Sequence, residues 1–260
     1  MSQFNVFFVK ELRENWRSFK FIWIPLVFIL LGASDPVMNY FLEDILNAVG
    51  NVPEGFEMMM PDYAPIDLIY ATTGQFQSIG LIVLVAAFAG SISRERQNGT
   101  ATLLYVRPIS YRTFFLSKWA VASIVSIFSA VAGYGASMYY TAILYGTVDP
   151  ASFMKMLGTY IIWILFVMAV TLAMSAIFNT AIATALSIII ISIGLIIDSL
   201  IGSFWTISPW KLATYGVQFI SGGQDAKDYL FTLCLTIGLT IVLIGLGMLC
   251  SKKNASLTKI

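Results

Sequence analysis

Histidine is absent from the chain, and charged residues are scarce. Without histidine there is no His general base, no His metal ligand and no Ser-His-Asp triad. Only 11% of the 260 residues are charged and 58% are hydrophobic, whereas about a quarter of the residues in a typical soluble domain are charged. The mean hydropathy of +0.82 leaves too little polar surface to cover a soluble globule. These values exclude a soluble enzyme, a nucleic-acid-binding protein and a disordered chain, and they indicate an integral membrane protein.

Cysteine is also rare, and both copies, Cys234 and Cys250, lie in one apolar stretch. On a helix they would be roughly 24 Å apart, which is far beyond the reach of a disulfide. The triplet Met58-Met59-Met60 has no His or Cys near it, so it makes a poor soft-metal site. We therefore expect no bound metal.

Long apolar runs fall into six groups, each close to the ~20 residues that a helix needs to cross a bilayer. They cover 20–41, 72–93, 115–145, 154–178, 181–201 and 229–250. We expect an all-α integral membrane protein, in which residues 1–260 form a single transmembrane domain. Asn179-Thr180 predicts a tight hairpin between the fourth and fifth spans. Aromatic residues around Pro209 predict short outer helices between the fifth and sixth spans.

Basic residues are distributed unevenly between the two sets of connections. All of the 15 Lys and Arg residues except Lys155, Lys211 and Lys227 lie in the N-terminal segment, the 94–118 loop or the C-terminal tail. Because cytoplasmic connections are enriched in Lys and Arg, these segments are predicted to be cytoplasmic. We expect a multi-pass protein of the bacterial cytoplasmic membrane with both termini in the cytoplasm.

The N-terminal segment 1–19 has an amphipathic helical pattern. Lys10, Arg13 and Arg17 fall on one face, and Trp16 falls on an opposite face that is rich in phenylalanine. This pattern predicts an elbow helix lying on the cytoplasmic leaflet, with its cations at lipid headgroups. Such a helix either anchors the chain or transmits movement to the first span.

The loop between the second and third spans is the most informative segment. Thr100 can cap a short amphipathic helix over 100–107, and Pro108 disfavours helical geometry at Arg107. One interpretation is a lever whose residues Leu103 and Leu104 insert into a groove on a partner. The other is an ordinary positively charged loop.

The motif in this loop resembles the signature of permease subunits of ABC transporters, in the type-2 exporter family. It runs on through Ile109-Ser110 to Phe114-Phe115-Leu116 and Lys118, and its first part comprises Glu95, Gly99 and Thr100, then Leu103-Leu104 and Arg107-Pro108. The resemblance implies a coupling helix that docks through these residues on a separate ATP-binding subunit. It further implies a homodimer or a heterodimer with a second permease, contact with membrane lipid rather than nucleic acid, and ATP-driven export with ATP and Mg²⁺ on the partner subunit.

The chain itself lacks a phosphate-binding loop, because it contains no Gly-Lys dipeptide. We therefore expect a transporter subunit that is not an enzyme and that binds no cofactor of its own. No Asp, Glu, Lys or Arg lies at the centre of a predicted span, which argues against ion coupling. The alternatives to an exporter subunit are an ATP-independent secondary carrier and a membrane scaffold protein.

Polar residues at the start of the second span are candidates for a substrate path: Thr72, Thr73, Gln75, Gln77 and Ser78. Thr72 and Gln75 are the two that we select, although the outer end of any span tolerates polar residues. In the third span, two rows of small residues, Ala122-Ser126-Ala130 and Ser129-Gly133-Ser137, predict close helix packing. The contact is either within one subunit or between two subunits.

Overall fold

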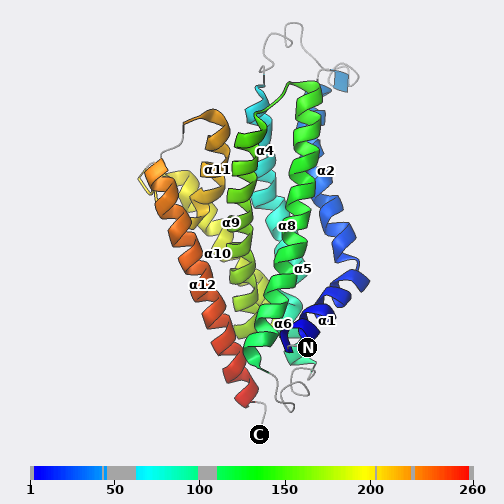
Figure 1. Ribbon diagram of the computed structural model, residues 1–260, viewed down its shortest axis with the longest axis vertical. Coiled ribbons are helices and arrows are strands. Elements are labelled where there is room, and N and C mark those ends of the chain that lie inside the picture. Colours follow the sequence, from blue (N-terminus) through cyan, green and yellow to red (C-terminus); the bar gives the residue numbers. More distant parts are fainter. Residues whose placement is uncertain are drawn as a thin grey trace.

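A computed structural model describes residues 3–42, 44–45, 63–98, 110–202, 204–223 and 226–257. All regular elements in these residues are helices (Figure 1). They are α1 (Gln3–Arg17), α2 (Lys20–Tyr40), α4 (Pro65–Gln75), η2 (Phe76–Gly80), α5 (Leu81–Phe88), α6 (Gly90–Gln97), α8 (Tyr111–Leu144), α9 (Pro150–Ile177), α10 (Thr180–Ile201), η3 (Pro209–Lys211), α11 (Leu212–Ser221) and α12 (Ala226–Leu257).

Six helical segments in the described residues are long and apolar enough to cross a membrane, which confirms the predicted all-α fold with six spans. The second span is the composite of α4, η2, α5 and α6. It begins at Pro65 rather than at residue 72. Proline suits the first turn of a helix, and the Asp67 carboxylate accepts a hydrogen bond from the Ala64 backbone N–H at 3.0 Å. Pro65 and Asp67, which mark the start of the helix, precede the hydrophobic run from which the span was predicted.

The N-terminal helix α1 turns sharply into α2. Phe19, at the bend, has a φ of 57°, the one positive φ among the described non-glycine residues. The bend lays α1 across the lower part of α8 (Figure 1). The C-terminal part of α12 lies at this same end of the molecule.

The core of the bundle is built around α9, which packs against α8, α10, α11 and α12. Most of α9 is buried, whereas α10 and α12 expose most of their apolar surface. Large aromatic side chains fill the centre, where Tyr160 lies between Tyr134 and Trp163 with ring centroids 5.0 and 5.3 Å away. All three rings are buried.

Short connections join the later spans. Two residues separate α9 from α10, and the Asn179 side chain accepts a hydrogen bond from the Ile182 N–H at 2.9 Å, so the predicted hairpin is present. The short helices η3 and α11 lie between α10 and α12, as expected for that segment.

Helices α2 and α8 approach each other closely and share an extensive contact. A Cβ atom on Gly32 would overlap the backbone carbonyl of Gly133, and one on Gly133 would overlap the Phe28 carbonyl. Ser126, Ser129 and Ala130 are also fully buried. The small-residue rows of the third span therefore pack within the subunit, which is the first of the two interpretations of their sequence pattern.

Replacing Gly133 with alanine should separate α2 from α8. We expect Gly133→Ala to lower the free energy of unfolding by about 1–3 kcal/mol, the usual effect of overpacking, measured by equilibrium unfolding in mixed detergent micelles. Gly135→Ala on the same helix is the matched control, because no atom lies within 4 Å of its added Cβ. An equal loss in both variants would contradict the close α2–α8 packing.

Candidate functional site

The predicted coupling segment falls largely outside the described residues. Gly99, Thr100, Leu103, Leu104, Arg107 and Pro108 all lie there, so their role stays a prediction. Glu95 is described, and it lies near the end of α6, which leads into that segment. The candidate site is therefore built from α6 and the helices that contact it.

The carboxylate of Glu95 points inward and joins a buried ion network. Its Oε1 atom lies 3.0 Å from Lys118 Nζ and 3.1 Å from Lys10 Nζ. Lys118 Nζ also lies 2.8 Å from Glu11 Oε1. The network of Lys10, Glu11, Glu95 and Lys118 thereby connects α1, α6 and α8.

Burial makes these ion pairs strong constraints. The side chains of Lys118, Glu11 and Glu95 are only 2%, 5% and 14% exposed. A buried charge costs several kcal/mol unless it is paired and hydrogen bonded. Lys118 can therefore remain buried only while α1 and α6 bring Glu11 and Glu95 to it.

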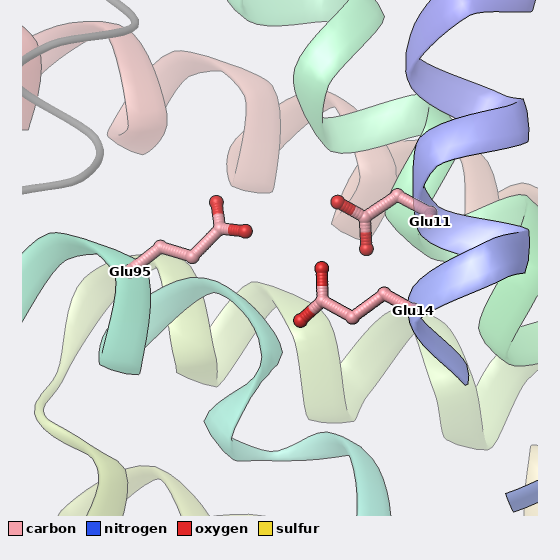
Figure 2. Close-up of side chains that lie close together, drawn as sticks. All are labelled: Glu11, Glu14 and Glu95. Atoms are coloured by element: carbon pink, nitrogen blue, oxygen red, sulfur yellow. The ribbon is translucent and has the colours of Figure 1, made fainter. Parts of the chain in front are cut away.

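A third carboxylate, that of Glu14, lies beside the network. Figure 2 shows Glu11 and Glu14 on α1, with Glu95 facing them from α6. Oxygen atoms of the three carboxylates lie within 4.8 Å of one another, a spacing that could hold a cation. The ammonium groups of Lys118 and Lys10 already supply positive charge at this point.

Lys10 is the more exposed cation of the network. Partial burial lowers the pKa of Lys10, but the carboxylates of Glu95, Glu11 and Glu14 outweigh this effect and raise it above its ordinary value. Because the pKa is higher in the folded chain, the stabilisation is complete at neutral pH. It is lost only as the pH rises through the raised pKa.

Arg96, the next residue along α6, binds the end of α9. Its guanidinium donates hydrogen bonds to the backbone carbonyls of Ala176, at 2.7 Å, and of Phe178. Free carbonyl groups and the negative end of the helix dipole make a helix C-terminus a favourable place for a cation. Arg96 therefore fixes α6 to the hairpin between α9 and α10.

A break in the second span supplies further bonds to the same hairpin. Helix α5 ends at Phe88 and α6 begins at Gly90. The backbone N–H groups of Ile92 and Ser93 donate to Ser175 Oγ at 3.2 and 3.1 Å. The Ser93 and Thr180 hydroxyls are 2.7 Å apart. Sequence reasoning missed these contacts and those of Arg96 and Lys118, because no local pattern identifies their partners.

The predicted elbow residues lie on two faces of α1. Lys10 joins the ion network, whereas Arg13, Trp16 and Arg17 are exposed, with Trp16 63% exposed. A third stripe, formed by Phe7, Glu11 and Asn15, is buried. The helical pattern distinguished an apolar face and a cationic face, but it did not reveal this stripe. The four-residue spacing of Phe7, Glu11 and Asn15 was the sequence signal that could have identified the buried stripe.

The two selected residues of the second span hold helices together. The Thr72 and Ser137 hydroxyls are 2.8 Å apart and buried. Gln75 donates to the Asp35 carboxylate at 2.7 Å and accepts from the Ser34 hydroxyl at 3.1 Å. Gln77 and Ser78 line a cavity of about 460 Å³, whereas Thr72 and Gln75 do not.

Comparisons with known proteins agree with the membrane fold. The family model described as ABC-2 family transporter protein matches residues 6–250. The chain is also similar to the uncharacterized transmembrane protein YxlG of Bacillus subtilis (strain 168). The two are 31% identical over 176 residues, which cover 68% of each chain.

Removing the charge of Lys118 should destabilise the fold more than removing that of Lys10. We expect Lys118→Met to cost about 3–5 kcal/mol, because two buried carboxylates lose a partner. We expect Lys10→Met, at a half-exposed position, to cost less than about 1 kcal/mol. Equilibrium unfolding in mixed micelles measures both. Adding Glu11→Gln to Lys118→Met should recover part of the loss. Equal stabilities of Lys118→Met and Lys10→Met would contradict the importance of the buried network.

Proposed function

The chain belongs to the ABC-2 family of transporter proteins, and on that premise we propose that it is the permease subunit of an exporter driven by a separate ATP-binding subunit. The absence of a Gly-Lys dipeptide supports placing ATP and Mg²⁺ on the partner, since a phosphate-binding loop requires that pair. The complete transporter would contain two permeases, either two copies of this chain or this chain with a related one.

The attachment of α6 carries the proposal. Through Glu95 it is ion-paired with α1 and α8, and through Arg96 it is hydrogen bonded to the end of α9. These contacts lie directly before residues 99–107, where the resemblance places the coupling helix. A displacement of that segment by an ATP-binding subunit would therefore move several helices together, because α6 is fastened to each of them.

The proposed mechanism is mechanical. Binding and hydrolysis of ATP on the partner would displace the 99–107 segment and select between two packings of the same helices. Leu103 and Leu104 would be the apolar docking contacts. Glu95 would act as a positioning residue that transmits movement, because its carboxylate faces Lys118 and Lys10 within the bundle.

The exposed surface of α1 supports a location at the cytoplasmic face of the membrane. Arg13 and Arg17 are exposed and suit lipid phosphates, while Trp16 suits the boundary between headgroups and acyl chains. Under this proposal both termini are cytoplasmic. The Lys118 network then lies at the cytoplasmic end of the bundle, next to the ATP-binding subunit.

Purification with a mild detergent tests the proposed partner. A tagged chain should recover an ATP-binding protein that carries the phosphate-loop motif and hydrolyses ATP. To measure coupling, we would place one cysteine at Thr214, a residue of α11 that lines the cavity of about 460 Å³, after replacing Cys234 and Cys250 with serine. ATP should change its labelling rate, and Glu95→Gln or Leu104→Ala should abolish the change while hydrolysis continues. A coupling of 1–3 kcal/mol corresponds to an effect of about 5- to 150-fold.

Glu14→Gln is the matched control, because Glu14 is 59% exposed and reaches only Lys10, at 4.0 Å, among the ion pairs of the described residues. It should keep the ATP-dependent change in labelling. The proposed function is overturned if no ATP-hydrolysing partner is recovered. It is also overturned if transport into liposomes follows an ion gradient without ATP. An unchanged response in Glu95→Gln would refute the positioning role of Glu95.

Labelling of single cysteines tests the orientation. Ser18 and Ser221 are both exposed. Helix α1, which Ser18 follows, and helix α11, which ends at Ser221, lie at opposite ends of the bundle (Figure 1). In the same cysteine-free background, Ser221→Cys should react with a membrane-impermeant maleimide in intact cells. Ser18→Cys should react only after the cells are opened. The reverse pattern would show that the termini are not cytoplasmic.

A further inference from the structure

A cavity of about 460 Å³ opens between the second span, α10 and the short helices that follow α10. We call it the α4–α10 cavity and define it by Gln77, Ser78, Ile196, Asp198, Trp210 and Lys211. Its volume lies within the range of about 300–1,000 Å³ that is usual for small-molecule sites. At its rim, Tyr70 and Ile196 are 59% and 55% exposed, so a ligand can enter from outside the bundle.

Two local distortions shape this cavity. Residues Phe76–Gly80 form η2, a turn of π-helix, which rotates Gln77 and Ser78 away from the regular α-helical phase. Such turns occur frequently at functional sites. Opposite them, the Trp210 ring packs directly on Gly194 of α10, where any Cβ would overlap the indole. The absence of a side chain at residue 194 therefore lets Trp210 form part of the cavity wall.

Polar atoms in the cavity wall lack hydrogen-bond partners. Gln77 Nε2 and Trp210 Nε1 are buried donors with none, and Asp198 Oδ1 is a buried acceptor with none. A buried polar group without a partner costs about 1–3 kcal/mol. These atoms expose almost no surface, so a polar ligand in the cavity would satisfy two donors and one acceptor only after the side chains turn toward it.

The two charged side chains of the cavity wall, Lys211 and Asp198, form a long ion pair. Lys211 Nζ lies 3.8 Å from Asp198 Oδ1, within reach of an ion pair but too far for a good hydrogen bond. Both side chains are partly exposed, at 15% and 12%. A purely anionic ligand would gain from Lys211 and be repelled by Asp198, and a purely cationic ligand would meet the opposite problem. A ligand that carries both charges can pair with each.

We propose that the α4–α10 cavity binds an amphiphile with a zwitterionic head, such as a phosphoethanolamine group. Its phosphate accepts hydrogen bonds from Lys211, Gln77 and Trp210, and its ammonium pairs with Asp198. The first carbons of its chains contact Ile196 and Tyr70 at the rim. The further assignment of this amphiphile as transported cargo rests on the proposed function, whereas the binding site does not.

Competition between short-chain lipids tests the site on the full-length chain in maltoside micelles. Native mass spectrometry would compare dihexanoyl phosphatidylethanolamine, its anionic phosphatidylglycerol counterpart and free phosphoethanolamine. We expect the zwitterionic lipid to bind about 10-fold more tightly than the anionic one, the size of one charge-assisted hydrogen bond. The free headgroup should bind more weakly still, because it lacks the chains.

Three variants make the result specific. Asp198→Asn leaves Lys211 uncompensated and should turn the preference toward the anionic lipid. Lys211→Met should weaken both lipids, and Gln77→Met should weaken both without changing their ratio. Ile79→Met is the matched control, because Ile79 lies two residues away, is 49% exposed and lies outside the cavity. Its lipid ratio should equal that of the unaltered chain.

Equal binding of the two lipids, or an Asp198→Asn variant with an unchanged ratio, would overturn the proposal. Tighter binding of free phosphoethanolamine than of the lipid would overturn the amphiphile assignment. These measurements need no ATP-binding subunit. If the partner is absent and the zwitterionic lipid still binds selectively, the proposed function fails and the site stands. If the partner is present and the lipids bind alike, the site fails alone.

Discussion

A single buried ammonium group, that of Lys118, determines how the lower end of the bundle is assembled. It lies between the carboxylates of Glu11 and Glu95, which belong to helices far apart in the sequence. An unpaired charge in this setting would cost more free energy than most single contacts in a protein supply. The folding of α1 back onto α8 and the position of α6 are therefore mutually dependent, and neither helix can move alone without taking a partner from a buried charge.

The other contacts of α6 extend this constraint to the rest of the bundle. Arg96 and Ser93 bind the α9–α10 hairpin, and α9 in turn forms the buried centre of the fold. Higher in the bundle, the Gly32–Gly133 approach and aromatic packing join the helices, together with the Gln75–Asp35 hydrogen bond and the loose Lys211–Asp198 pair. Most ion pairs of the described residues are concentrated where the chain leads into the proposed coupling segment, and largely apolar packing supports the remainder.

The sequence predicted the spans well because hydropathy and length are local properties, and each of the six appears at about the expected place. It predicted Glu95 and Lys10 as candidates but gave no sign that Glu95 shares Lys118 with Glu11, since Glu11 and Lys118 are separated by 107 positions. It selected Thr72 and Gln75 for the substrate path, whereas Gln77 and Ser78 line the cavity. The π-helical turn at Phe76–Gly80 changes the helical phase there, and a regular wheel cannot anticipate that change.

The second span connects two polar regions that differ in how well their groups are satisfied. At the α6 end, the charges of Lys118 and Glu11 are paired, and changing the arrangement would cost free energy. At the η2 end, Gln77 and Trp210 retain unused donors, so a ligand that supplied acceptors would lower the free energy. Between them α5 is apolar and packed in the core. Under the proposed function, this segment would carry strain from the ion network toward the cavity, because it contains no polar group that could absorb the strain by changing partners.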